Sequence, residues 1–127
     1  MNLKSALIAA LAVASVATPA LAWNWRLLGE RNVMDRTDHD SIGLPGDREF
    51  NRIRLCVYRN PVHFYDVHIR YRNGGVQDVS MRSRINPGGC TRAIDLNGAN
   101  RNVERIDMTY EETSFRRRTA TVRGFGE

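Results

Sequence analysis

The sequence predicts an all-β domain: a single antiparallel β-sandwich of about seven or eight short strands, preceded by a signal-peptide helix that is cleaved. Two observations carry this prediction. Apolar and polar residues alternate with a period of two in several stretches, which is typical of strands that bury one face. Clusters of Gly, Pro and Asn separate these stretches, and no stretch has apolar residues at the helical spacing i, i+3, i+4 and i+7.

Residues 1–22 have the pattern of a secretory signal peptide. Lys4 supplies a positive charge, an alanine-rich apolar run follows, and Ala20-Leu21-Ala22 is a small-residue cleavage site. The run is shorter than the about 20 apolar residues that a membrane-spanning helix needs. We therefore expect a mature domain of residues 23–127, periplasmic or secreted, with no membrane span.

Arginine supplies all the permanent side-chain positive charge of the mature domain. The chain has 19 basic and 14 acidic residues, and Lys4 leaves with the signal peptide. Arginine forms bidentate contacts with carboxylates and phosphates, so the bias would suit an acidic partner. An arginine-favouring codon usage would give the same bias, and nucleic acid is not an expected partner of an exported protein.

The mature chain begins with one strand and one long loop. Trp25, Leu27 and Gly29 are in phase and predict a first strand within residues 23–33. Residues 35–42 are too polar and too rich in Asp for a central strand. Residues 43–47 contain Gly-Leu-Pro-Gly, which is turn chemistry, so we expect the longest loop here.

The clearest alternation lies in residues 51–79, in two runs that Asn60-Pro61 separates. The first run places Ile53, Leu55 and Val57 on one face and Arg52, Arg54, Cys56 and Tyr58 on the other. In the second run Tyr65, Val67, Ile69 and Tyr71 alternate with Asp66, His68, Arg70 and Arg72. We expect the two strands to pair, with Val67 and Ile69 facing a core that a second layer covers.

Four further segments complete the predicted sandwich. Asn73-Gly74-Gly75 predicts a hairpin into a short strand over residues 76–82, and a strand over residues 91–96 follows the turn at residues 86–89. The strand at residues 101–110 has Ile106, Met108 and Tyr110 on one face, and Val103 is out of step, which suggests a bulge. Residues 111–118, which include Arg116-Arg117-Arg118, are predicted to be a solvated loop. The strand at residues 119–125 turns Ala120 and Val122 inward.

Cys56 and Cys90 are the cysteines of the chain. An even number in an exported protein favours a disulfide bond. The bridge would close a loop of about 35 residues and stabilise the fold by about 3 to 4 kcal/mol. The alternative is that the two thiols lie too far apart to bond.

The acidic segment that contains Asp35, Asp38, His39 and Asp40 is a weak candidate for a metal site. Calcium prefers carboxylate oxygens gathered on a flexible loop, but the segment lacks the glycine and the closing glutamate of a helical-hand loop. The alternative is that these acids cap turns or pair with arginines. A hydrolase or metal-dependent enzyme that uses residues 35–40 is a second alternative function.

No other pattern favours catalysis or a cofactor. The three histidines lack metal-ligand spacing, and alternation places His63 and His68 on opposite strand faces. There is no Gly-x-Ser-x-Gly elbow and no phosphate-binding glycine loop. We therefore expect neither an enzyme nor a bound cofactor.

The polar faces of the two central strands form a candidate anion-binding site. Its members are Arg52, Arg54, His68, Arg70 and Arg72, which strand pairing would bring together. Such a stripe could bind an anionic glycan or lipid. A cross-strand ladder with Glu49, Asp66 and Asp78 is the alternative.

Several short segments together resemble a family of small exported bacterial proteins known as a domain of unknown function. The matching segments are Trp25-Arg26-Leu27-Leu28-Gly29, Asp38-His39-Asp40-Ser41-Ile42, Ile53-Arg54-Leu55, Tyr65-Asp66-Val67, Asn73-Gly74, Gln77-Asp78-Val79 and Ile94-Asp95-Leu96-Asn97-Gly98 with Arg101. The resemblance implies a periplasmic β-sandwich without an established activity or cofactor. It suggests a role for residues 38–40 and Arg101, and we expect an Asp–Arg pair that locks one end of the sandwich.

The leading functional hypothesis is a non-enzymatic interaction or structural module of the cell envelope. The first alternative is a binder of acidic ligands through the arginine-bearing sheet. The two differ in charge pattern, because ligand binding predicts arginines gathered without acids, whereas the module predicts arginines and acids interleaved.

Overall fold

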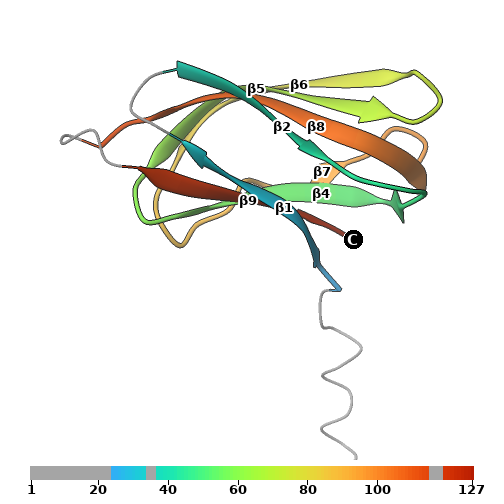
Figure 1. Cartoon of the computed structure of the whole chain (residues 1–127), viewed down its shortest axis with the longest axis horizontal. Coiled ribbons are helices and arrows are strands. Elements are labelled where there is room, and N and C mark those ends of the chain that lie inside the picture. Colours follow the sequence, from blue (N-terminus) through green and yellow to red (C-terminus); the bar gives the residue numbers. More distant parts are fainter. Residues whose placement is uncertain (1–23, 34–36, 115–118) are drawn as a thin grey trace, which may run out of the picture.

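The computed structural model describes residues 24–33, 37–114 and 119–127. The predicted signal peptide, Asp35 and the Arg116-Arg117-Arg118 run lie outside the described residues. The described chain is all-β and forms two antiparallel sheets packed face to face (Figure 1). Within these ranges, no helix is long and apolar enough to span a membrane.

In the described ranges nine strands build the two sheets, and two of the strands are only two residues long. They are β1 (Arg26–Val33), β2 (Thr37–Gly43), β3 (Glu49–Phe50), β4 (Arg52–Tyr58), β5 (Val62–Tyr71), β6 (Val76–Ile85), β7 (Ile94–Asp95), β8 (Arg101–Glu112) and β9 (Ala120–Gly126). The first sheet has the order β1-β9-β4-β7 and the second has the order β2-β8-β5-β6, with β3 paired to β8.

The core lies between the sheets and follows the predicted alternation. Ile53, Leu55 and Val57 of β4 are fully buried, as are Val67 and Ile69 of β5. The side chains with no exposed surface also include Val33, Val62, Phe64, Val103, Ile106, Tyr110, Ala120 and Val122. The two-layered core predicted from the sequence is confirmed.

The expected pairing of the two central strands is wrong. β4 pairs with β9 and β7 in the first sheet, whereas β5 pairs with β8 and β6 in the second. The chain crosses from one sheet to the other between Tyr58 and Val62. A strand's alternation shows that it has a buried face, but either sheet of a sandwich offers that environment.

Two bulges change the expected side-chain phase. In β1 the register shifts between Leu27 and Gly29, so that Leu28 is buried and Leu27 is 53% exposed. In β5 the register shifts between Phe64 and Asp66, so that His63 and His68 both lie on the outer face. The prediction that His63 and His68 face opposite sides is therefore wrong.

The bulge predicted near Val103 is confirmed. Arg70 pairs with Arg105 and Tyr71 pairs with Val103, so Glu104 is the extra residue of β8. The bulge returns Val103 to the core. β8 runs to Glu112, which is buried, so the predicted loop begins later than expected.

The segment expected to be a long loop contains edge strand β2. Asp38 and Asp40 are in phase with buried Ile42, so these acids lie at inward positions of an outermost strand. Inward charges on an edge strand discourage pairing with a second chain. The polar sequence is thus incompatible with a central strand but compatible with an edge.

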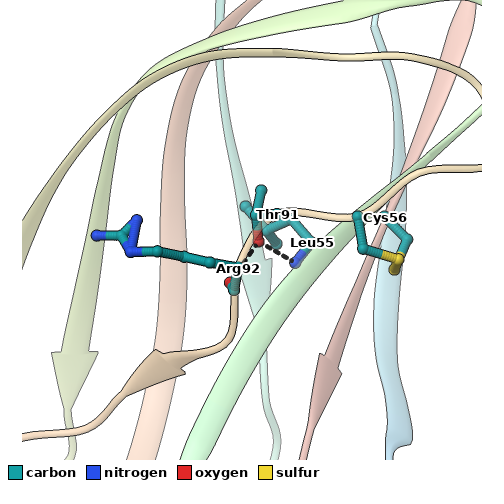
Figure 2. The surroundings of a disulfide bond; sticks show 5 residues. Leu55, Cys56, Thr91 and Arg92 are labelled. Atoms are coloured by element: carbon teal, nitrogen blue, oxygen red, sulfur yellow. Dashed lines mark hydrogen bonds between the residues drawn. A yellow bond between two sulfur atoms is a disulfide. The ribbon is translucent and has the colours of Figure 1, made fainter.

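The predicted disulfide bond between Cys56 and Cys90 is present, with Cα atoms 3.9 Å apart (Figure 2). It joins β4 to the segment that precedes β7. Thr91 reinforces the junction, because its hydroxyl accepts the Leu55 N–H at 3.1 Å and donates to the Arg92 carbonyl at 2.9 Å. The expected strand at residues 91–96 is reduced to β7.

Candidate functional site

The structure separates the predicted anion-binding residues. Arg52 and Arg54 lie on the outer face of the first sheet, whereas His68 and Arg70 lie on the outer face of the second. These faces point away from each other. The prediction that the five residues share one surface is therefore wrong, and each sheet has its own candidate surface.

On the second sheet, Asp107 of β8 is a shared acceptor. It accepts hydrogen bonds from Ser41 at 2.5 Å and from Arg70 Nε at 2.8 Å, and Arg105 Nε lies 3.0 Å away. Burial alone would raise the pKa of Asp107, but the Ser41 and Arg70 hydrogen bonds and the Arg105 charge outweigh burial and lower that pKa. Asp107 is therefore held ionised.

The same face carries a shallow depression of about 430 Å³. Residues lining it are His39, Asp40, Ser41, His68, Arg105, Asp107, Met108 and Thr109. His39 Nδ1 lies 3.0 Å from the Thr109 hydroxyl, and His68 hydrogen-bonds Asp78. Arginines and acids interleave here, which is the pattern expected of a structural ladder.

Arg72 has a structural contact. One terminal nitrogen donates to the Leu44 carbonyl at 2.6 Å, and Nε lies 3.4 Å from the Asn102 side chain. Arg72 thus fastens the segment between β2 and β3 to the second sheet.

The acidic segment and Arg101 lie apart. Asp40 accepts a 2.8 Å hydrogen bond from Tyr110, and Asp38 is opposite Tyr110 in the β2–β8 register. Arg101 stacks on the Tyr71 ring at 3.7 Å and donates to the Asn97 carbonyl at 2.7 Å. Arg101 begins β8, so about 30 Å of strand separates it from Tyr110. The expected Asp–Arg lock is wrong.

The described residues do not have the geometry that the metal-binding alternative requires. No group of three or more His, Cys, Asp or Glu side chains within those ranges is arranged to hold an ion. Asp38 and Asp40 instead lie beside the buried phenol of Tyr110. Burial, with the Asp40 hydrogen bond and the charges of Asp40 and Asp38, raises the pKa of Tyr110 far above its usual value.

On the first sheet, aromatic rings and guanidinium groups alternate. We name this surface the aromatic–arginine face. Its residues are Trp25, Leu27, Arg54, Tyr58, Arg123 and Phe125. The Arg54 guanidinium lies 4.5 Å from the Trp25 ring centroid and 6.0 Å from that of Phe125, and Arg123 lies 4.7 Å from that of Tyr58. Cation–π contacts thus join the arginines of this surface to its aromatic rings.

Sequence reasoning found only Arg54 of this surface as a candidate site residue. Phe125 could have been found, because Ala120 and Val122 face inward and the alternation of β9 then turns Phe125 outward. Leu27 could not, because the bulge in β1 reverses its phase. Trp25 precedes β1, so no strand pattern fixes its direction.

Comparison with known families assigns the chain to a family. Residues 6–126 match the family described as Domain of unknown function (DUF2541). The chain belongs to this family. No curated protein and no solved structure matches it. The DUF2541 description names no activity, so a functional assignment depends on the surfaces described above.

Proposed function

We propose that this DUF2541 protein is an exported, non-enzymatic β-sandwich that binds a partner through the aromatic–arginine face. The observation that carries the proposal is the exposure of Leu27. Leu27 and Val76 are the large apolar side chains that the described residues leave exposed, at 53% and 47%. Leu27 lies beside Phe125 and near Trp25 and Arg54, whereas Val76 lies near a strand end of the second sheet.

The residue types of this surface support the proposal. Trp, Tyr, Phe and Arg are enriched at the centres of protein interfaces, where they contribute most of the binding energy. The sheet beneath is rigid, because β4 is bonded to β9 along its length and linked covalently to Cys90. A rigid surface loses little conformational entropy when it binds.

Two features of the second sheet support a non-enzymatic role. The Asp107 carboxylate is stabilised in its ionised form by three side chains, so it is a poor proton acceptor at neutral pH. The Asp40 carboxylate accepts from Tyr110, whose raised pKa keeps the phenol protonated. Both acids are thus engaged in structural hydrogen bonds.

The disulfide bond supports export. Disulfide bonds persist in oxidising compartments and are rare in the reducing cytosol. The signal peptide predicted from the sequence would direct the chain to such a compartment. The mass of the recovered protein tests this, since cleavage after Ala22 would leave a chain that begins at Trp23.

Site-specific photo-crosslinking tests the binding surface. A photoreactive phenylalanine derivative replaces Leu27 in one variant and Val76 in a matched control, and both proteins are irradiated in the cells that produce them. We expect a discrete adduct from position 27 that is absent from position 76. Identical adduct patterns from both positions would refute a role for the aromatic–arginine face.

A further inference from the structure

Arg54 differs from the other arginines on the outer face of the first sheet. Arg52 forms an ion pair with Glu127 at 2.9 Å, and Arg123 forms one with Glu30 at 2.9 Å. Arg54 has no hydrogen bond or ion pair to any residue in the described ranges, and its Nε is buried without an acceptor. Its guanidinium group lies against the rings of Trp25 and Phe125.

This arrangement leaves a positive charge that no described residue neutralises through an ion pair. The Nε–H group of Arg54 is shielded from water, and a desolvated donor without an acceptor is costly. A carboxylate that approached from outside would accept two parallel hydrogen bonds from one guanidinium group. The rings of Trp25 and Phe125 would exclude water from that contact and strengthen it.

The residues around Arg54 indicate which kind of ligand could carry this carboxylate. Leu27, Phe125 and Arg54 occupy opposed positions on the adjacent strands β1, β9 and β4. A ligand that contacts this row must present apolar surface beside its acid. The row lies outside both the 430 Å³ depression of the second sheet and a 290 Å³ depression lined by Arg26, Phe50 and others. The outer face of a sheet suits a protein segment better than a small molecule, which needs a concave site.

We infer that Arg54 binds an Asp or Glu carboxylate of a protein partner, in a segment whose neighbouring apolar side chains pack on Leu27 and Phe125. This inference depends on the proposed function and specifies its partner as an acidic, apolar segment. Trp25 and Phe125 position the guanidinium group. Arg70 of the second sheet is the matched residue, because it lies outside this face and Asp107 already neutralises its charge.

Peptide binding to the purified mature protein tests the inference. The probe is acetyl-Leu-Asp-Phe-Glu-Leu-amide, and its control is the same peptide with Asn and Gln in place of the acids. Nuclear magnetic resonance follows the Nε–H signal of Arg54 during titration. We expect the acidic peptide alone to shift this signal, and Arg54→Gln to weaken binding by about tenfold or more, since a charge-assisted hydrogen bond is lost.

Arg70→Gln is the control variant, and it should leave the affinity within about twofold, because Arg70 lies on the second sheet, outside the aromatic–arginine face. Equal weakening by Arg54→Gln and Arg70→Gln would indicate a nonspecific charge effect and overturn the inference. Equal binding of both peptides would also overturn it. Binding of a galacturonate oligomer at Arg54 without binding of the acidic peptide would show that the face takes an acidic glycan instead.

Crosslinking separates this inference from the proposed function. The photoreactive residue at position 27 is combined with Arg54→Gln in one chain. Loss of the adduct supports the carboxylate contact. An adduct that persists unchanged would refute the role of Arg54 while the partner-binding role of the face stands. A protein without any adduct at position 27 would refute both.

Discussion

The hydroxyl group of Tyr110 donates a 2.8 Å hydrogen bond to the carboxylate of Asp40, which joins a fully buried ring of β8 to edge strand β2. A buried hydroxyl group without a hydrogen-bond partner is costly, and Asp40 supplies the acceptor for Tyr110. The inward position of Asp40 on β2 brings its carboxylate within reach of the Tyr110 hydroxyl group. The acidic segment, which resembles a cation site in sequence, thus provides the acceptor for Tyr110 and the inward charges of edge strand β2.

Tyr110 should make the folded protein sensitive to alkali. Its folded pKa is raised, so above about pH 10 the unfolded chain releases a proton that the folded chain retains, and stability falls as the pH rises. We expect Tyr110→Phe to flatten this decline. Urea unfolding at pH 8 and at pH 10.5 measures it. An equal decline in both proteins would contradict the assignment.

Asp107 should make the folded protein sensitive to acid. Its folded pKa is lowered, so its stabilising contribution is present above about pH 4 and is lost as the pH falls through the folded value. We expect Asp107→Asn to reduce the free energy of unfolding at pH 7 by about 1 to 3 kcal/mol. Asp78→Asn is the control, since this carboxylate is 72% exposed and should contribute less than about 1 kcal/mol.

The disulfide bond should contribute about 3 to 4 kcal/mol, because it closes a loop with a sequence separation of 34. We expect the double variant Cys56→Ser and Cys90→Ser to have a free energy of unfolding that is lower by this amount. It should therefore unfold at a lower denaturant concentration. Thiol titration of the denatured, unreduced protein should find no free thiol. Two thiols per chain, or equal unfolding midpoints, would show that the bridge does not form in solution.

A side chain at Gly126 should destabilise the fold. A Cβ atom there would lie 2.7 Å from the Phe50 ring, which is closer than van der Waals contact allows. We expect Gly126→Ala to destabilise the protein by about 1 to 3 kcal/mol. In Gly43→Ala the new Cβ meets no atom within 4 Å, so its unfolding midpoint should match the wild type or exceed it slightly. Equal effects of the two substitutions would contradict the close packing of β9 on Phe50.

The local pattern of the sequence predicts features that depend on neighbouring residues. Alternation at Ile53, Leu55 and Val57 identifies β4 and its buried face, because a strand's own geometry sends successive side chains to opposite sides. Val103 breaks the alternation of β8 and so reveals its bulge. The bulges of β1 and β5 escape detection because apolar residues flank both sides of the shift, as Leu27 and Leu28 do in β1.

By itself the sequence determined that the chain is an all-β sandwich, which alternating positions of β4 and β9 enter its core, and that Cys56 and Cys90 are the candidates for a disulfide bond. Only the tertiary structure decided that β4 and β5 belong to different sheets, and therefore that Arg54 and Arg70 face opposite directions. The physical reason is that alternation depends on one strand, whereas pairing depends on backbone groups far apart in the chain. The contact of Arg54 with Trp25 and Phe125 arises from that pairing and from nothing local.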